Sequence, residues 1–438
     1  MSATNESPRH PAGLYVLSGV MVWERFGYYG MRAILTLYMV NFLFQGLQGL
    51  TQEQATARAG TVYGWFTGLV YLTPILGGYL ADRYLGKKVA IVLGAALMGL
   101  GYLVMAVPNL VAFYCALGIV ILGNGFFKPT ASTAVGHLYV GRESLKDSAF
   151  TIFYMGINVG AFFAPLVCGI LADKVGWGWG FAAAGVGMLV SIATFFGGMK
   201  HLGPALASPE RTGTAGGKMA TDAPLTTEER HGVLVILILA FFVIFFWSVF
   251  EQAGSSLTLF ADRSTDRMLF GFEVPASWFQ SLNPIFIVVL GVPFSRLWTW
   301  LGRRNPSTPA KMAWGLLMVS LGFMLMIPAS MLASGGSKVV MLWLVGVYLT
   351  HTVGELCLSP VGLSMVSKLA PVKFASMLMG VWFTANFIAN LVGGLFAGLY
   401  DVLPLTTFFV IPTVSAGIAA LVLFAISRPL ARWTHGRA

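Results

Sequence analysis

The chain has 438 residues, of which 57% are hydrophobic and only 10% are charged. Soluble domains carry about 25% charged residues, so this composition excludes a soluble globular protein. Apolar runs of about 20 residues recur from end to end, and each can cross the hydrocarbon core of a bilayer. The net charge of +10 does not indicate nucleic acid, because basic cytoplasmic loops are ordinary in membrane proteins. We therefore expect a protein embedded in a lipid bilayer, with no nucleic-acid partner.

Twelve apolar segments follow a polar N-terminus and predict an all-α membrane protein with twelve transmembrane helices. The segments are residues 14–43, 60–81, 88–107, 110–133, 148–172, 180–199, 232–258, 276–300, 309–333, 338–367, 375–400 and 406–427. The first segment lacks the flanks of a signal peptide, so we expect it to be retained. Cys115, Cys168 and Cys357 lie within apolar runs without metal-type spacing. We expect them to be small core residues, and we expect no metal and no cofactor.

The positive charges predict the orientation in the membrane. With both termini in the cytoplasm, nineteen of the 27 Lys and Arg residues fall on the cytoplasmic side. Only five fall outside: Arg58, Lys174, Arg263, Arg267 and Lys338. An excess of Lys and Arg in cytoplasmic loops is the usual signal for orientation, so we expect a multi-pass protein of the inner or plasma membrane with cytoplasmic termini.

The stretch 200–231 is the only long polar one between apolar segments, and it is rich in Gly, Pro, Ala and Thr. It predicts a flexible cytoplasmic linker between two six-helix bundles, residues 1–199 and 232–438. Each half has a short basic turn after its second segment, GGYLADRYLGKK at 77–88 and SRLWTWLGRR at 295–304. Repeated halves are the layout of major facilitator transporters, which bind substrate near mid-membrane at the interface of the halves. The first turn resembles the signature loop of that superfamily.

Once the Lys and Arg residues near the segment ends are assigned to one side of the membrane or the other, three basic residues remain, and three acidic residues also fall within the predicted segments. They are Arg25, Arg32, Lys128, Glu24, Glu251 and Glu355. Each costs about 2.5–3.5 kcal/mol at a helix centre, so we expect them to pair or to line a wet cavity. Intramembrane ionisable groups are functional by default. The alternative is that Glu24, Arg25, Arg32 and Glu251 form salt bridges that only hold helices together.

Helical spacing groups polar and aromatic residues with these charges. At about 100° per residue, Arg25, Tyr29 and Arg32 share one stripe, and Glu24 and Tyr28 form the next. The same spacing relates four further sets: Trp247 with Glu251, Tyr154 with Asn158, His351 with Glu355 and Ser359, and Trp382 with Asn386 and Asn390. Cations in one half and carboxylates in the other suit a ligand with an anionic and a cationic end, such as a peptide or amino acid.

Two groups of aromatic residues and one histidine can also be interpreted as structural and not functional. We interpret His351 as a packing or hydrogen-bonding residue, because a single histidine in a helix is more often structural than functional. Trp247 and Phe250 are equally compatible with a core and with a pocket. Trp298 and Trp300 are typical of an interfacial belt.

The run WERFGYYGMRAIL at 23–35 resembles the fingerprint of the proton-coupled oligopeptide transporter family, Glu-x-x-Glu-Arg-Phe-x-Tyr-Tyr-Gly. Four more stretches are similar to that family: GNGFFKPTAST at 123–133, FYMGINVGAFFAP at 153–165, FWSVFEQAGSSL at 246–257 and GELCLSPVGLSMVSKLAP at 354–371. The resemblance spans the chain. It implies a major facilitator fold and a secondary active transporter, not an enzyme, that imports di- and tripeptides with protons by alternating access.

The resemblance also implies substrate-binding residues by matched position. Those for the peptide carboxylate are Arg25, Arg32 and Lys128, with Tyr29 and Tyr71 nearby. Those for the α-amino group are Glu355, Asn158 and Asn283. A side-chain pocket would be lined by Trp382 and Asn386, and we add Tyr154, which lies one turn before Asn158. Recognition of the peptide's termini implies broad specificity.

Two departures from the family pattern affect coupling and size. The family's first glutamate falls at Met21, so one carboxylate usually assigned to proton coupling is absent. Glu24, Arg25 and Glu251 are then the coupling residues that we predict. We expect Glu251 to pair with Arg32 when deprotonated and to release it on protonation. Many bacterial members have two extra helices between the halves, whereas 200–231 is too short and polar for them, so we expect a minimal twelve-helix member. We also expect a monomer.

Other functions remain open. A membrane receptor or an enzyme would also use a charged pocket. However, the chain has no G-x-x-x-x-G-K-[ST] loop, no H-E-x-x-H and no G-x-S-x-G motif. Its segments outside the membrane are too short for a catalytic domain. Among transporters, the alternative is a peptide uniporter or a relative that takes nitrate, amino acids or drugs, with weakened proton coupling because of Met21.

Overall fold

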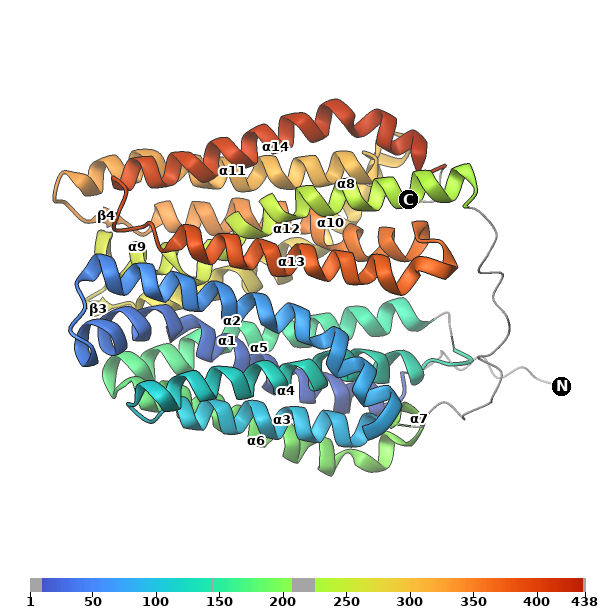
Figure 1. The fold of residues 1–438 in the computed structure, drawn as a ribbon, viewed down its shortest axis with the longest axis horizontal. Coiled ribbons are helices and arrows are strands. Elements are labelled where there is room, and N and C mark those ends of the chain that lie inside the picture. The colour runs from blue at the N-terminus through green and yellow to red at the C-terminus, as the bar shows by residue number, and fades with distance from the viewer. Residues whose placement is uncertain (1–9, 143–144, 207–224, 436–438) are drawn as a thin grey trace. The chain divides into compact units, whose positions relative to one another are not determined.

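A computed structural model describes residues 10–142, 145–206 and 225–435, which are largely helical (Figure 1). Ten helices of this described part are long and apolar enough to cross a membrane. They are Lys87–Met105, Leu110–His137, Ser148–Lys174, Trp177–Gly197, Thr227–Ser264, Ala276–Arg304, Thr308–Ser334, Leu342–Ser359, Met377–Ala397 and Leu405–Trp433. They match the third to the twelfth predicted segments. The prediction of an all-α membrane protein is confirmed.

The first two predicted segments also form long helices, α1 (Ala12–Leu37) and α2 (Gln52–Leu80). With 26 and 29 residues, both are long enough to span a bilayer. They are less apolar than the other ten, because α1 carries Glu24, Arg25 and Arg32 while α2 begins with a polar turn. The count of twelve spans therefore stays a prediction.

Contacts divide the chain into two compact units. The first comprises Met1–Arg32 and Thr73–Thr212, and the second comprises Ala33–Leu72 and Gly213–Ala438. Helices α1 and α2 therefore each contribute to both units, so the units do not end where the predicted bundles do. The division into bundles at 1–199 and 232–438 stays a prediction. Most of the predicted linker lies outside the described residues.

The first unit is built from helices that pack through glycine. Its further elements are η2 (Ala81–Leu85), α3 (Lys87–Met105), α4 (Leu110–His137), α5 (Lys146–Lys174), α6 (Trp177–Gly197), η4 (Met199–His201) and α7 (Gly203–Leu206). Helix α4 begins after Asn109, whose side chain accepts the N–H groups of Val111 and Ala112. A Cβ at Gly94 would lie 2.7 Å from the Gly123 carbonyl oxygen, so these glycines let α3 and α4 approach closely.

The second unit contains the remaining elements. They are η1 (Tyr38–Leu47), α8 (Thr227–Phe250), η5 (Glu251–Gly254), α9 (Ser256–Ser264), β1 (Thr265–Asp266), β2 (Met268–Leu269), β3 (Phe272–Glu273), η6 (Ala276–Ser281), α10 (Leu282–Leu301), η7 (Gly302–Arg304), α11 (Thr308–Ser334), β4 (Val339–Val340), α12 (Leu342–Leu369), η8 (Val372–Phe374), α13 (Ala375–Ala397) and α14 (Leu405–Trp433). A capping box between Thr226 and Glu229 starts α8.

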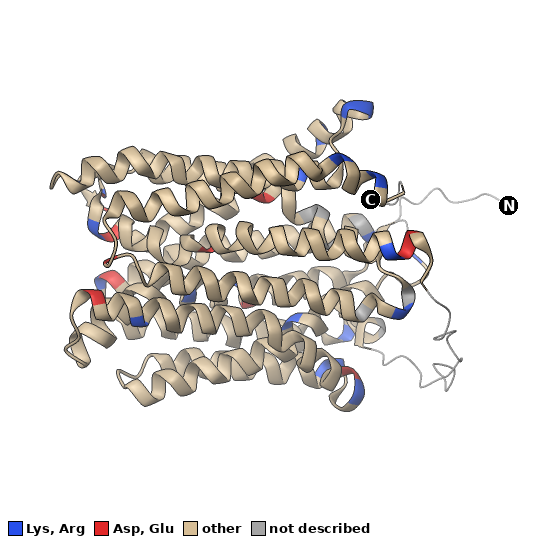
Figure 2. Cartoon of the chain, turned by 45° about the horizontal axis from the view of Figure 1, so that its top comes forward, with Lys and Arg blue, Asp and Glu red and all other residues tan. Residues whose placement is uncertain are grey.

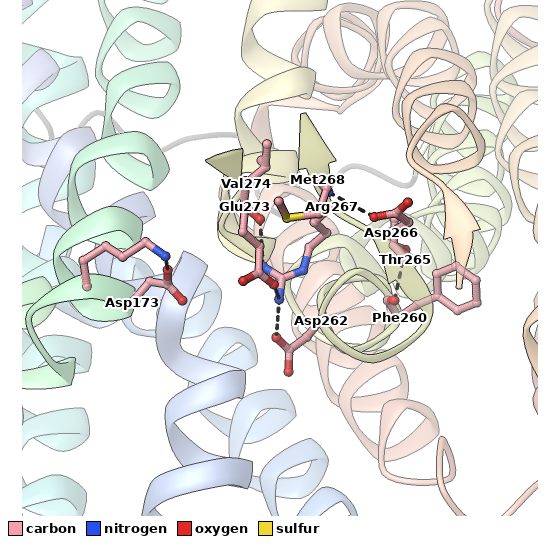
Figure 3. A network of polar contacts seen from close by, with 10 residues as sticks. Asp173, Phe260, Asp262, Thr265, Asp266, Arg267, Met268, Glu273 and Val274 are labelled. Atoms are coloured by element: carbon pink, nitrogen blue, oxygen red, sulfur yellow. Dashed lines mark hydrogen bonds and ion pairs between the residues drawn. The ribbon is translucent and has the colours of Figure 1, made fainter. Parts of the chain in front are cut away.

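The short strands of the second unit form two pairs. Strand β1 pairs in parallel with β4, and β2 pairs in antiparallel with β3. Arg267, between β1 and β2, binds Glu273 at 2.9 Å and Asp262 at 3.5 Å (Figure 3).

Within the second unit, α2 packs on α13 through a seam of glycines. A Cβ at Gly60 would lie 2.4 Å from the Gly398 nitrogen, and one at Gly394 would lie 2.2 Å from the Gly64 Cα. No side chain fits between two backbones at this separation. We call these four residues the glycine seam.

One carboxylate fastens the end of this seam. Asp401 accepts hydrogen bonds from Gln52 at 3.0 Å and from Thr56, and Arg263 donates to both of its oxygens at 2.9 Å. The side chain of Asp401 is 15% exposed. These four residues, the Asp401 cluster, join the start of α2 to α9 and to the turn after α13.

The structure also locates the cysteines and the charges. Cys168 and Cys357 are buried as expected, but Cys115 is exposed, so its assignment to the core is wrong. An apolar run in a membrane protein has a side that faces lipid, and hydropathy does not tell the two sides apart. Most Lys and Arg residues lie at helix ends, and a few lie inside helices (Figure 2). The predicted orientation stays a prediction.

Replacing Asp401 with Asn should destabilise the second unit, because Arg263 would lose its partly buried counter-ion. Hydrogen bonds to charged groups contribute about 1.5–3 kcal/mol, so we expect a lower apparent Tm for the detergent-purified protein. Asp173→Asn is the matched control, since Asp173, labelled in Figure 3, pairs with Lys174 and both side chains are exposed. Equal Tm values for the two variants would contradict the role given to the Asp401 cluster.

Candidate functional site

A cationic stripe runs along α1 in the first unit, as the spacing predicts. The ring of Tyr29 lies between two guanidinium groups, 5.9 Å from that of Arg25 and 5.8 Å from that of Arg32. Arg25 also lies 5.5 Å from the ring of Tyr28. Both arginines are buried. Contacts of this kind favour a desolvated cation, so the aromatic rings help to hold two positive charges in one place.

The fully buried Glu24 neutralises one of these charges. Its two oxygens accept Nε of Arg25 at 2.5 Å and Nη2 at 2.9 Å, which is a bidentate ion pair. Because the two residues are adjacent on one helix, this pair does not tie α1 to another helix. The interpretation as a bridge between helices therefore fails for Glu24 and Arg25. Arg32 lies seven residues further along the same stripe.

A carboxylate site lies in the second unit, where α10 packs on α12. Asn283, in the first turn of α10, donates through Nδ2 to Glu355 at 2.8 Å and to Thr352 at 3.1 Å. The structure thus brings Asn283 and Glu355 together, as the resemblance implied. Thr352 was not among the predicted residues. The signal that pointed to it is its position three residues before Glu355, which places both on one face of α12.

The other predicted substrate residues are distributed over both units. Asn158 is buried in the first unit, and its amide donates to the Tyr154 carbonyl oxygen at 2.9 Å. It therefore belongs to a different unit from Asn283 and Glu355. Lys128 is half-buried on α4 of the first unit, and Tyr71 is half-buried in the part of α2 that belongs to the second.

Two predicted pocket residues on α13 are buried in the second unit. The indole of Trp382 packs on Gly362 of α12. The amide of Asn386 donates to the Trp382 carbonyl oxygen at 2.9 Å, and that of Asn390 donates to Asn386 in the same way. One N–H group of each amide is used within its own helix, which leaves the second N–H group and the side-chain carbonyl oxygen as the groups that could bind a ligand.

The predicted coupling residue Glu251 lies directly after the end of α8. Glu251 is 6% exposed and is the first residue of η5, the 3₁₀ turn that follows α8. Met21 is a buried residue of α1 in the first unit.

His351 stacks on Phe323, with the two ring centroids 5.2 Å apart, and a Cβ at Gly322 would touch its imidazole. These contacts support the interpretation of His351 as a packing residue.

A family model described as the POT family matches residues 88–205 and 212–428. The chain belongs to the POT family. The predicted family is thereby confirmed, and with it a transporter rather than an enzyme. Within the described residues of this POT protein, no group of three or more His, Cys, Asp or Glu side chains is arranged to hold a metal ion.

Three transporters to which the chain is similar match almost all of its length. A peptide transporter of Yersinia enterocolitica, YePEPT, is 36% identical over 97% of this chain and 95% of its own length. A di-/tripeptide transporter of Lactococcus lactis is 32% identical over 96% of both chains. The uncharacterised transporter YclF of Bacillus subtilis is 36% identical over 96% of this chain and 95% of its own.

Solved POT structures share the fold. A crystal structure of a peptide transporter POT with sulfate has a TM-score of 0.87 at 34% identity and covers 98% of this chain and 96% of its own. A POT family transporter in complex with 5-aminolevulinic acid has a TM-score of 0.85 at 28% identity, over 96% of this chain and 97% of its own. The major facilitator fold predicted from the sequence is therefore confirmed.

Replacing Glu24 with Gln should destabilise the POT protein strongly, because it leaves the buried Arg25 without a counter-ion. Removing one partner of a buried ion pair costs about 3–5 kcal/mol, so the apparent Tm in detergent should fall sharply. The control is Glu273→Gln, since Glu273 is 48% exposed and its ion pair with Arg267 is worth much less. A variant at Glu24 that unfolds at the wild-type Tm would show that Arg25 does not depend on this carboxylate.

Proposed function

We propose that this POT protein imports di- and tripeptides by proton symport. The observation that carries the proposal is the pairing of Asn283 with Glu355 in the second unit, taken with the cationic stripe of α1. A zwitterion needs both kinds of group, because each of its charges loses water on binding and is stabilised by an opposite charge. Relatives over the full length named as peptide and di-/tripeptide transporters support the same substrate class.

The peptide carboxylate is the group that the cations would bind. Arg25, Arg32 and Lys128 supply the charge, and Tyr29 and Tyr71 supply hydroxyl groups. Arginine is well suited to this role, because its planar fork donates two parallel hydrogen bonds to a carboxylate. Arg25 would make this contact while it binds Glu24 in a bidentate pair.

The α-amino group of the peptide is the cation that Glu355 would bind. Asn283 holds the carboxylate of Glu355 at 2.8 Å and so orients it. Asn158 is the third residue that we assign to the amino group. We assign the peptide side chains to Trp382, Asn386 and Tyr154. Contacts with the two termini are common to all short peptides, so specificity for the side chains should be broad.

Proton coupling would act through Glu251, with Glu24 and Arg25 as the other coupling residues. A proton drives transport only if it changes the preference between conformations open to opposite sides. Deprotonated Glu251 competes with the peptide carboxylate for Arg32, and protonation of Glu251 ends this competition. Peptide and proton would then be carried together by alternating access. We also propose a monomer in the inner or plasma membrane. Cytoplasmic termini are proposed because this orientation would place nineteen of the 27 Lys and Arg residues on the cytoplasmic side.

Proteoliposomes containing the purified protein should accumulate labelled dialanine when an inward proton gradient is imposed. The gradient supplies the energy, so a protonophore should reduce uptake to equilibration. Empty liposomes are the control. The absence of dialanine uptake under every gradient would reject peptide transport.

Glu251→Gln should abolish accumulation driven by the proton gradient but retain counterflow of labelled against unlabelled dialanine. The amide mimics the protonated acid, so the peptide still binds and exchanges while the coupling is lost. Glu273→Gln, a neutralised surface glutamate, should behave as the wild type. Undiminished gradient-driven accumulation in Glu251→Gln would reject this residue as the coupling group.

A second candidate function follows from Met21. A buried thioether where the family has a carboxylate removes one protonatable group from α1. The candidate is a peptide uniporter, or a transporter of nitrate, amino acids or drugs with weakened coupling. Dialanine uptake that only equilibrates, with or without a gradient, would favour the uniporter, and the absence of dialanine uptake would favour another substrate.

A further inference from the structure

A chain of hydrogen bonds starts at Thr352, a fully buried residue of α12. Its hydroxyl lies 2.7 Å from the Tyr348 carbonyl oxygen, to which it donates. A carbonyl oxygen only accepts, and a hydroxyl has a single hydrogen. The hydroxyl hydrogen of Thr352 is therefore committed to Tyr348, and its oxygen can act only as an acceptor towards other groups.

This acceptor fixes the orientation of the Asn283 side chain. Asn283 approaches Thr352 at 3.1 Å and the Glu355 carboxylate at 2.8 Å, both through Nδ2. Both neighbours are acceptors, and an amide nitrogen has two hydrogens to donate. If the amide were turned over, its oxygen would face the lone pairs of Thr352 and of the carboxylate. The two neighbours thus select the same orientation.

The consequence is that two hydrogen-bond acceptors, Oδ1 of Asn283 and the carboxylate of Glu355, lie beside each other. With both N–H groups of Asn283 engaged, its Oδ1 is the remaining polar atom of the amide, and the carboxylate of Glu355 is held beside it. A primary ammonium carries three donors, and an N-acetylated amine carries one N–H and no charge. Two acceptors held together therefore discriminate in favour of a free ammonium.

We infer that Thr352 is a positioning residue that fixes the polarity of Asn283, so that Asn283 and Glu355 together select peptides with a free α-amino group. The inference rests on the proposed peptide transport. Without the hydroxyl, only Glu355 would still orient the amide, and the terminal torsion of an asparagine side chain is broad. In this proposal Thr352 acts through Asn283 and not on the peptide itself.

Thr352→Val tests the inference, because valine keeps the β-branched shape and removes the hydroxyl. We expect the KM for labelled dialanine to rise about tenfold with kcat nearly unchanged, the pattern of lost binding shared by ground and transition states. Inhibition by N-acetyl-dialanine should change little, so the preference for the free amine should fall by a similar factor. Thr352→Ser should restore both values, since serine retains the hydroxyl.

Thr350→Val is the matched control on the same helix. The hydroxyl of Thr350 donates to the backbone carbonyl oxygens of Gly346 and Val347, so its loss should leave KM and the amine preference at the wild-type values. If Thr352→Val does not fold in detergent, Thr352→Ala is measured by the same criteria.

The outcomes separate this inference from the proposed function. Wild-type uptake of dialanine together with an unchanged KM and amine preference in Thr352→Val would overturn the inference alone. A loss in kcat that Thr352→Ser does not restore would also overturn it, because it would indicate a general structural role. If the wild type itself fails to take up dialanine, both the proposed function and the inference fail.

Discussion

The cost of placing a charge in a bilayer governs this chain. Water is absent from the hydrocarbon core, so a buried ion is tolerated only where other groups replace its hydration. Glu24 and Arg25 meet this requirement within two residues by a bidentate pair. Tyr29, between Arg25 and Arg32, adds the faces of its ring. In the second unit Asn283 has the same role for Glu355, as a neutral donor to a carboxylate.

These two solutions differ in what they leave for a ligand. An ion pair cancels its own field, whereas an amide donor stabilises a carboxylate and leaves its negative charge in place. The Glu24–Arg25 pair therefore has no net charge to offer a ligand. Asn283, by contrast, donates to Glu355 without supplying a positive charge.

Much of the fold could be predicted, because periodicity and hydropathy are local. Ten of the twelve apolar segments correspond to helices that can span a membrane. The stripe of α1 also follows from spacing along one helix. The partners of Asn283 could not be derived from spacing alone, because they lie on another helix. Resemblance supplied Glu355, and Thr352 was missed although its position three residues before Glu355 places it on the same face of α12. The Asp401 cluster was missed for the same reason, since Gln52 and Asp401 are far apart in the sequence. The exposure of Cys115 depends on which side of the helix faces lipid.

The glycine seam between α2 and α13 has a mechanical consequence. Packed helices normally interlock their side chains, and sliding one past the other forces many rotamers to change together. At Gly60, Gly64, Gly394 and Gly398 two bare backbones meet, and there is nothing to interlock. Such a contact resists compression of the two helices against each other, but it resists sliding of one helix along the other only weakly. Because α2 also belongs to the first unit through its last residues, the glycine seam lies on a helix that both units share.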